Sequence, residues 1–107
     1  MQEGKIYLAS MLQSDGQTKI IPVLALKKMP NNDVLFCGIS TQLRHKIEDF
    51  DEIITPNNIN KLRATSLIRL SFLITLSENQ IVGLMGEISS ELHQTLIERL
   101  STYLINK

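Results

Sequence analysis

The sequence predicts a mainly β fold, a small β-barrel with one C-terminal helix packed on it. Short apolar runs rich in β-branched residues recur up to residue 88, and such runs are typical of strands. Turn-forming residues separate these runs, as at Asp15-Gly16 and Pro56-Asn57-Asn58. The last segment has leucines at every fourth position, the spacing of an amphipathic helix: Leu92, Leu96, Leu100 and Leu104.

Three strands are expected in the N-terminal part, over residues 5–11, 20–26 and 34–40. The second of these runs contains Pro22, which is compatible with a strand because it lies near the strand's start. There the missing N–H removes little of the ladder of hydrogen bonds. A cluster of turn-forming residues at 29–33 leads into the third strand.

The later elements are expected as follows. Residues 47–54 alternate without a clean apolar face, which favours an edge strand. Residues 66–76 predict a long strand, bent along its length, and residues 84–88 predict a short one. Ser89 or Ser90 is expected to cap a helix over about 90–105, with Glu91 in the first turn, where its charge is favoured by the helix dipole.

Length and charge limit the possible classes. The 107 residues, 43% of them hydrophobic, fit one domain over residues 1–107 with a single core. The formal net charge is zero, so no global field attracts the protein to nucleic acid or to a membrane. The charges are uneven, however, because residues 16–32 and 53–77 contain basic residues and no acidic ones. A locally basic face is therefore compatible with the neutral total.

The compartment is predicted from what the sequence lacks. Cys37 is the only cysteine, so no internal disulfide can form, and its apolar neighbours predict a buried thiol. The first residues lack the basic start and apolar run of a signal peptide. No stretch reaches the roughly 20 apolar residues of a membrane span. We expect a soluble cytoplasmic protein without membrane contact.

Five short segments, in this order and spacing, resemble the PemK/MazF family of toxin–antitoxin ribonucleases. They are Gly4-Lys5-Ile6-Tyr7, Ile21-Pro22-Val23-Leu24-Ala25, Ile39-Ser40-Thr41-Gln42, residues 66–76, and Gly86-Glu87-Ile88-Ser89 with the helix after it. The resemblance implies an SH3-like barrel that forms a homodimer. It also implies a type II toxin that cuts single-stranded RNA without a metal or other cofactor and is neutralised by an antitoxin protein.

The sequence departs from the family pattern where catalytic groups are expected. The family's Arg before the proline is Ile21 here, and its Thr at the end of the third strand is Ser40, which keeps a hydroxyl. The Gln and Arg of the fifth segment fall on Phe72 and Ile74. Ile21 cannot supply the forked donors with which an Arg binds phosphate oxygens. Lys19 lies two residues before it and would supply a point charge instead.

The candidate catalytic residues are therefore Ser40, as a phosphate contact, and Lys19, as a partial substitute for the missing Arg. Each has a plainer interpretation, because Ser40 also suits a turn at a strand end and Lys19 a solvated loop. The candidate RNA-binding residues are Arg44, Lys46, Arg63 and Arg69. No metal site is expected, because the two histidines and one cysteine are widely separated.

Two functions of different classes follow. The first is a type II toxin acting as a metal-independent endoribonuclease on single-stranded RNA. The second is a catalytically inactive barrel of the same family that binds a protein or a nucleic acid, since fold does not fix function. Loss of the family Arg at Ile21 is the observation that keeps the second alternative open.

Overall fold

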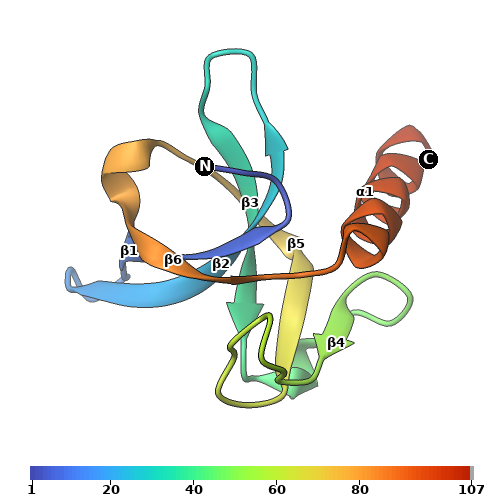
Figure 1. Cartoon of the computed structure of the whole chain (residues 1–107), viewed down its shortest axis with the longest axis horizontal. Helices are drawn as coiled ribbons and strands as arrows, with labels where there is room; N and C mark the ends of the chain where they lie inside the picture. Colours follow the sequence, from blue (N-terminus) through green and yellow to red (C-terminus); the bar gives the residue numbers. More distant parts are fainter. Residues whose placement is uncertain (107) are drawn as a thin grey trace.

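The computed structural model describes residues 1–106 and confirms the mainly β fold with a C-terminal helix (Figure 1). Two short 3-10 helices, Leu43–His45 and Glu78–Gln80, lie between strands. The main elements are β1 (Lys5–Leu12), β2 (Thr18–Lys28), β3 (Val34–Ser40), β4 (Glu52–Ile54), β5 (Ser66–Leu76), β6 (Ile81–Glu87) and α1 (Ser90–Ile105).

All six strands form one antiparallel sheet in the order β4-β5-β3-β2-β1-β6. The sheet is not closed, because β4 and β6 at its two ends are not hydrogen-bonded to each other within residues 1–106. Figure 1 shows α1 beside the part of the sheet that contains β5 and β4. The architecture is thus the expected one, with an opening between its end strands.

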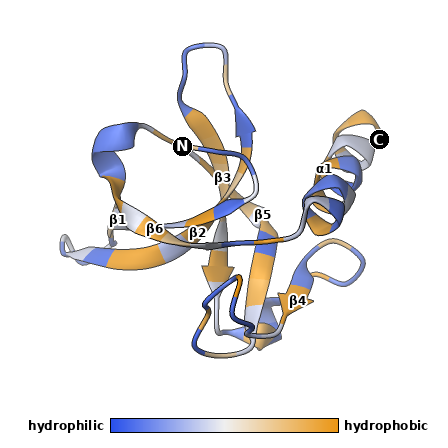
Figure 2. Ribbon diagram, in the orientation of Figure 1, coloured by the Kyte–Doolittle hydropathy of each residue, from blue (hydrophilic) through white to orange (hydrophobic). Residues whose placement is uncertain are grey.

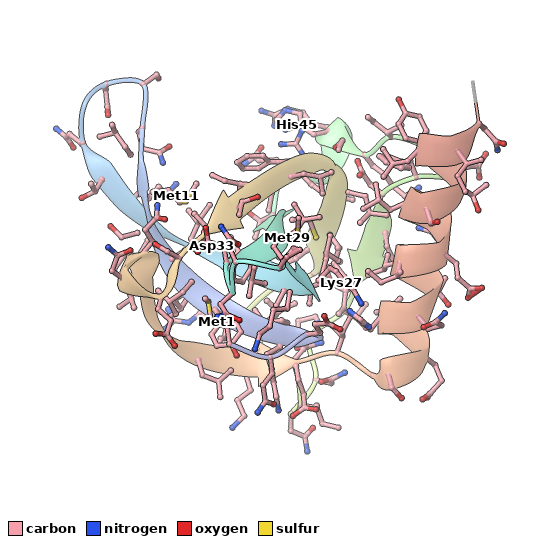
Figure 3. All side chains as sticks on the ribbon, turned by 90° about the horizontal axis from the view of Figure 1, so that it is seen from above. Met1, Met11, Lys27, Met29, Asp33 and His45 are labelled. Atoms are coloured by element: carbon pink, nitrogen blue, oxygen red, sulfur yellow. The ribbon has the colours of Figure 1, made fainter. Side chains whose placement is uncertain are left out.

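Figure 2 shows apolar stretches along β2, β3 and β5. The apolar residues of the strands form two core clusters, one on each side of the sheet. The helix-side cluster contains Ile6, Leu24, Leu26, Cys37, Ile39, Leu62, Ile68, Leu70, Ile88, Leu96 and Leu100. The second cluster contains Tyr7, Ala9, Val23, Ala25, Val34, Phe36 and Leu76, with Met1 and Met11 packed against it (Figure 3). Alternate residues of β2 enter opposite clusters, which explains its unbroken apolar run.

The helix begins as predicted at a serine cap. The Ser89 side chain accepts a hydrogen bond of 3.1 Å from the Leu92 backbone N–H. Leu96 and Leu100 are buried against the sheet, whereas Leu104 is exposed, so the buried stripe is shorter than the leucine spacing predicts. Within residues 1–106 no helix has the length and apolarity needed to cross a membrane.

The predicted edge strand over residues 47–54 is wrong for residues 47–51, which form a turn. The backbone N–H groups of Phe50 and Asp51 both bond to the Ile47 carbonyl, at 3.2 and 2.9 Å. The Asp51 carboxylate accepts a further bond of 3.0 Å from the Ile47 N–H. These local bonds replace the ladder, and only Glu52–Ile54 pairs with β5.

Strand β5 is irregular at its centre, as the predicted bend requires. Arg69 of β5 is opposite Gly38 of β3, whereas the next paired residue of β5, Leu73, is opposite the adjacent Cys37. Residues 70–72 therefore have no partner in β3 and form a bulge. A bulge bends a strand and re-aims its side chains, so it decides where Arg69 and Phe72 project.

Candidate functional site

A cleft of about 350 Å³ lies where the start of β2, the end of β3 and the bulged part of β5 meet. It is lined by Lys19, Ile20, Ile21, Pro22, Gly38, Ile39, Ser40, Thr41, Gln42, Ser66, Arg69 and Phe72. The register explains this grouping, because Gly38 is opposite both Val23 of β2 and Arg69 of β5. Opposed residues project to the same face of a sheet, so Arg69 shares a face with the alternate residues Ile21 and Lys19 of β2.

Gly38 forms the floor of the cleft because it has no side chain. A Cβ atom placed there would lie 2.7 Å from Cδ2 of Phe72, closer than real carbon contacts allow. The Phe72 ring therefore packs directly on the bare backbone of β3. This close approach is what requires glycine at this position.

Arg69 contributes a buried nitrogen atom to the cleft, one without a hydrogen-bond partner in the described part of the chain. Its Nε atom is buried and has no hydrogen-bond partner within residues 1–106. No carboxylate of the described residues forms an ion pair with its guanidinium. Buried donors in native proteins are nearly always paired, so an unpaired one calls for an explanation. A guanidinium left free in a cleft is suited to bind a phosphate with two parallel N–H donors.

Ser40 ends β3 and serves the turn that follows. Its Oγ accepts a hydrogen bond of 3.0 Å from the Gln42 backbone N–H. This is the plainer role foreseen from the sequence, and it leaves the hydroxyl hydrogen free to donate. The turn fixes the position of the hydroxyl at the rim of the cleft, so both roles are compatible in one side chain.

Lys19 lies in β2 opposite Met11, rather than in a loop, and its side chain is exposed. It brings a second cation to the cleft, and no acidic side chain is among the lining residues. The cleft is therefore locally positive although the whole chain is neutral. Nearby positive groups without acidic neighbours favour an anionic ligand.

The other three predicted RNA-binding residues do not line this cleft. Arg44 is exposed in the 3-10 helix Leu43–His45, and Arg63 is exposed in the loop before β5. Lys46 forms an ion pair of 3.0 Å with Glu48. His45 is also exposed and lies on the outer side of the ribbon (Figure 3). The structure thus brings Lys19, Ser40 and Arg69 together and leaves Arg44, Lys46 and Arg63 outside.

Three apolar residues occupy positions that are polar in the family, and they lie in two different places. Ile21 and Phe72 line the cleft, whereas Ile74 packs against the second cluster. No His, Asp, Glu or Cys is among the lining residues of the described chain. Within residues 1–106, no three His, Cys, Asp or Glu side chains gather closely enough to hold a metal ion. The cleft offers cations, hydroxyls and an apolar wall.

The role of Arg69 in this cleft was not apparent from the sequence, which grouped it with general RNA-binding cations. The acid-free stretch at residues 53–77 was the only available indication. The bulge at residues 70–72 sets the register between β5 and β3, and its position cannot be deduced from periodicity. Arg69 belongs to β5 and Ile21 to β2, so the cation reaches the cleft from another strand.

Comparisons with known proteins bear on the fold and the family of this chain. A search of curated protein sequences found no significant match. The fold is similar to that of an endoribonuclease in complex with its cognate antitoxin from a mycobacterial species, with a TM-score of 0.74 and 18% identity over 97% of this chain and 94% of that one. It is also similar to the Mycobacterium tuberculosis toxin MazF-mt6, with a TM-score of 0.71 and 18% identity over 96% of this chain and 98% of that one.

Identities this low establish likeness of fold, whereas the sequence pattern of a family establishes membership. The pattern that matches is that of the PemK-like, MazF-like toxin of type II toxin–antitoxin systems, over residues 2–104. This match spans all six strands and nearly all of α1. The chain therefore belongs to the PemK-like, MazF-like toxin family of type II toxin–antitoxin systems.

Proposed function

We propose that this toxin binds single-stranded RNA in the cleft formed by Lys19, Ser40 and Arg69 and cleaves it without a metal ion. The observation that carries the proposal is the unpaired, buried Nε of Arg69 in a cleft without acidic lining residues. Family membership supports it, as does the similar fold of the endoribonuclease that was solved with its antitoxin. Arg69 thereby replaces the family Arg that is Ile21 here.

The reaction proposed is attack of a ribose 2′-oxygen on the adjacent phosphorus. The bond to the 5′-oxygen of the next nucleotide breaks, so the products are a 2′,3′-cyclic phosphate and a 5′-hydroxyl. Arg69 donates two N–H groups to the phosphate oxygens, Ser40 donates its hydroxyl, and Lys19 adds positive charge. The 2′-hydroxyl proton passes to water and the leaving oxygen takes one from water, since no His, Asp or Glu is among the lining residues of the described chain.

A second candidate function is a toxin-family barrel that binds RNA without cutting it. The specific observation in its favour is the absence of a His, Asp or Glu among the lining residues of the described chain. General acid–base catalysis typically contributes about 10²–10⁴-fold to a rate, and this cleft supplies no side chain for it. Binding by Arg69 and Lys19 needs no such group.

The test is cleavage of a long single-stranded RNA in EDTA by the purified protein and its variants. Arg69→Ala and Ser40→Ala are each expected to lower the rate by about 10²–10³-fold, the usual effect of losing one preorganised donor. Arg69→Lys is expected to keep only part of the wild-type cleavage rate, because an ammonium group is a point charge and lacks the two parallel N–H donors of a guanidinium. Lys28→Ala is the matched control, since Lys28 is exposed at the far end of β2 and outside the cleft.

Three results are informative. Loss of cleavage in the cleft variants with normal cleavage by Lys28→Ala supports the ribonuclease. Equal cleavage by wild type and Arg69→Ala contradicts the site. RNA binding that depends on Arg69, with no cleavage by any of the proteins, supports the second candidate.

The homodimer and the antitoxin partner are part of the same proposal. A groove of about 850 Å³ lies between α1, the turn at residues 47–51 and β5, and its walls include Phe50, Leu70, Leu73 and Leu100. Three consecutive large apolar residues at the end of α1 are exposed: Tyr103, Leu104 and Ile105. Contiguous exposed apolar surface of this kind marks an interaction site, and we assign it to a second copy of the chain.

Sedimentation equilibrium tests the dimer. Leu104→Glu is expected to shift the mass from dimer to monomer, while Ser101→Glu, which is exposed on the same helix outside the groove, is not. A monomeric wild type contradicts the assignment. For the antitoxin, we expect an acidic segment that competes with RNA for the cleft, measurable as loss of RNA binding on titration.

A further inference from the structure

One wall of the cleft is apolar, which phosphate binding does not explain. The wall is formed by Ile20, Ile21, Pro22 and Phe72, beside Arg69. Ile20 is 54% exposed, and Phe72, Ile21 and Pro22 are half-buried. A phosphate gains nothing from apolar surface, so this wall is suited to a part of the ligand that is itself flat or apolar.

The Phe72 ring packs on the backbone of β3 in the absence of any ligand. It packs against the backbone of Gly38, where an added Cβ would lie 2.7 Å from Cδ2 and 3.3 Å from Cε2 of the ring. The bulge at residues 70–72 brings the ring to the same cleft as Arg69, three residues earlier. A ring that is already ordered loses little conformational entropy when a second ring stacks on it.

We propose that Phe72 is a stacking platform for one nucleobase of a bound single strand, next to the phosphate that Arg69 holds. The inference rests on the proposed binding of RNA in this cleft and deepens it. Aromatic side chains bind single strands by stacking on base faces, a mode that tolerates any base. At the position of the family's Gln, this chain thus has a hydrophobic contact to the base in place of a polar group.

Substitutions of Phe72 and of Arg69 should change the affinity for a single strand in different ways. Loss of a stacking contact weakens binding by about 5- to 150-fold at every salt concentration, because no counterion is involved. Loss of a phosphate contact instead flattens the dependence of log K on log salt by about 0.7 for a single strand. The salt slope therefore separates a platform from a cation in the same cleft.

The experiment measures binding of a fluorescein-labelled single-stranded DNA oligonucleotide by polarisation in EDTA over a series of salt concentrations. DNA lacks the 2′-hydroxyl, so binding is read without cleavage. Phe72→Ala and Phe72→Leu are expected to weaken binding by about 5- to 150-fold with an unchanged slope, while Phe72→Tyr keeps wild-type affinity. Leu84→Ala is the control, because Leu84 is a large apolar residue exposed on β6 that lines neither the cleft nor the groove beside α1.

A second arm replaces single nucleotides of the oligonucleotide by abasic ones. For wild type, an abasic nucleotide at the stacked position should cost as much as Phe72→Ala, and the two losses should not add. Equal affinity of wild type and Phe72→Ala overturns the platform, as do abasic losses that are the same in both proteins. So does a wild type that binds no oligonucleotide. RNA cleavage that survives Phe72→Ala with unchanged binding overturns the platform alone and leaves the proposed ribonuclease standing.

Discussion

The carboxylate of Asp51 binds both the backbone N–H and the hydroxyl of Ser71, at 3.1 and 3.2 Å. Ser71 is the central residue of the β5 bulge, so its N–H has no acceptor in β3. Asp51 is only 2% exposed and supplies that acceptor from the neighbouring turn. A buried carboxylate is tolerated only when it is well hydrogen-bonded, and here three donors meet it.

Replacement of Asp51 is expected to destabilise the fold strongly. Asp51→Ala leaves the N–H groups of Ser71 and Ile47 without acceptors and should lower the free energy of unfolding by about 3 kcal/mol. Ser71→Ala removes only the hydroxyl bond and should cost about 1 kcal/mol. Urea denaturation measures both. Wild-type stability of Asp51→Ala would show that the bulge does not depend on the carboxylate.

Gly38→Ala is expected to displace the Phe72 ring. The new methyl group would meet the ring at 2.7 Å, and overpacking of this kind costs about 1–3 kcal/mol of stability. In a Phe72→Ala background the obstacle is gone, so the same substitution should cost much less. Thermal unfolding of wild type, Gly38→Ala, Phe72→Ala and the double variant completes this double-mutant cycle. Additive losses would contradict the packing of Phe72 on Gly38.

Two glycines of β6 provide a matched pair. A Cβ at Gly86 would collide with the backbone carbonyl of Asn60, whereas a Cβ at Gly83 would meet nothing within 4 Å. Asn60 is buried and its side chain bonds to residues 55, 57 and 62, so its backbone cannot give way. Gly86→Ala should cost about 3 kcal/mol or more, and Gly83→Ala should be neutral or slightly stabilising. The urea midpoints of Gly86→Ala and Gly83→Ala measure the difference, and equal midpoints would refute the collision.

Cys37 gives a prediction in pH. Burial raises the pKa of the Cys37 thiol from 9.0 to about 12, and the charge of Asp51 adds to the rise. Between pH 9 and pH 12 the unfolded chain loses the thiol proton of Cys37, whereas the folded chain keeps it. Stability is therefore unaffected below pH 9 and falls by about 1.4 kcal/mol per pH unit up to pH 12.

The control is Cys37→Ala, which lacks the titrating group, so the difference between its pH profile and that of wild type isolates the thiol. Iodoacetamide should also label native Cys37 far more slowly than the unfolded chain at pH 8. Rapid labelling of the native protein would contradict the burial.

Strand bounds could be predicted from the sequence where an apolar run is clearly delimited by turn-forming residues. The bounds of β3 and β5 match the sequence prediction because each is an apolar run between turn-forming residues. The turn at residues 47–51 was missed because a buried Asp51 looks like a surface charge until its donors are known. The resemblance predicted Ser40 for the site and strand periodicity predicted Lys19; both line the cleft, and their catalytic roles stay predictions. The position of Arg69 there follows from the bulge, a long-range pairing that no local pattern encodes.

The open end of the sheet affects how this protein can be handled. The outer edge of β6 pairs with no strand within residues 1–106, and Val82 and Leu84 are 57% and 62% exposed there. Near Gly86 this edge is covered by the backbone of residues 59–60. Free edges with apolar side chains are templates for adding strands from other molecules. Concentrated samples of the isolated chain will therefore precipitate by strand addition at β6, and a charged substitution such as Val82→Lys will keep them in solution.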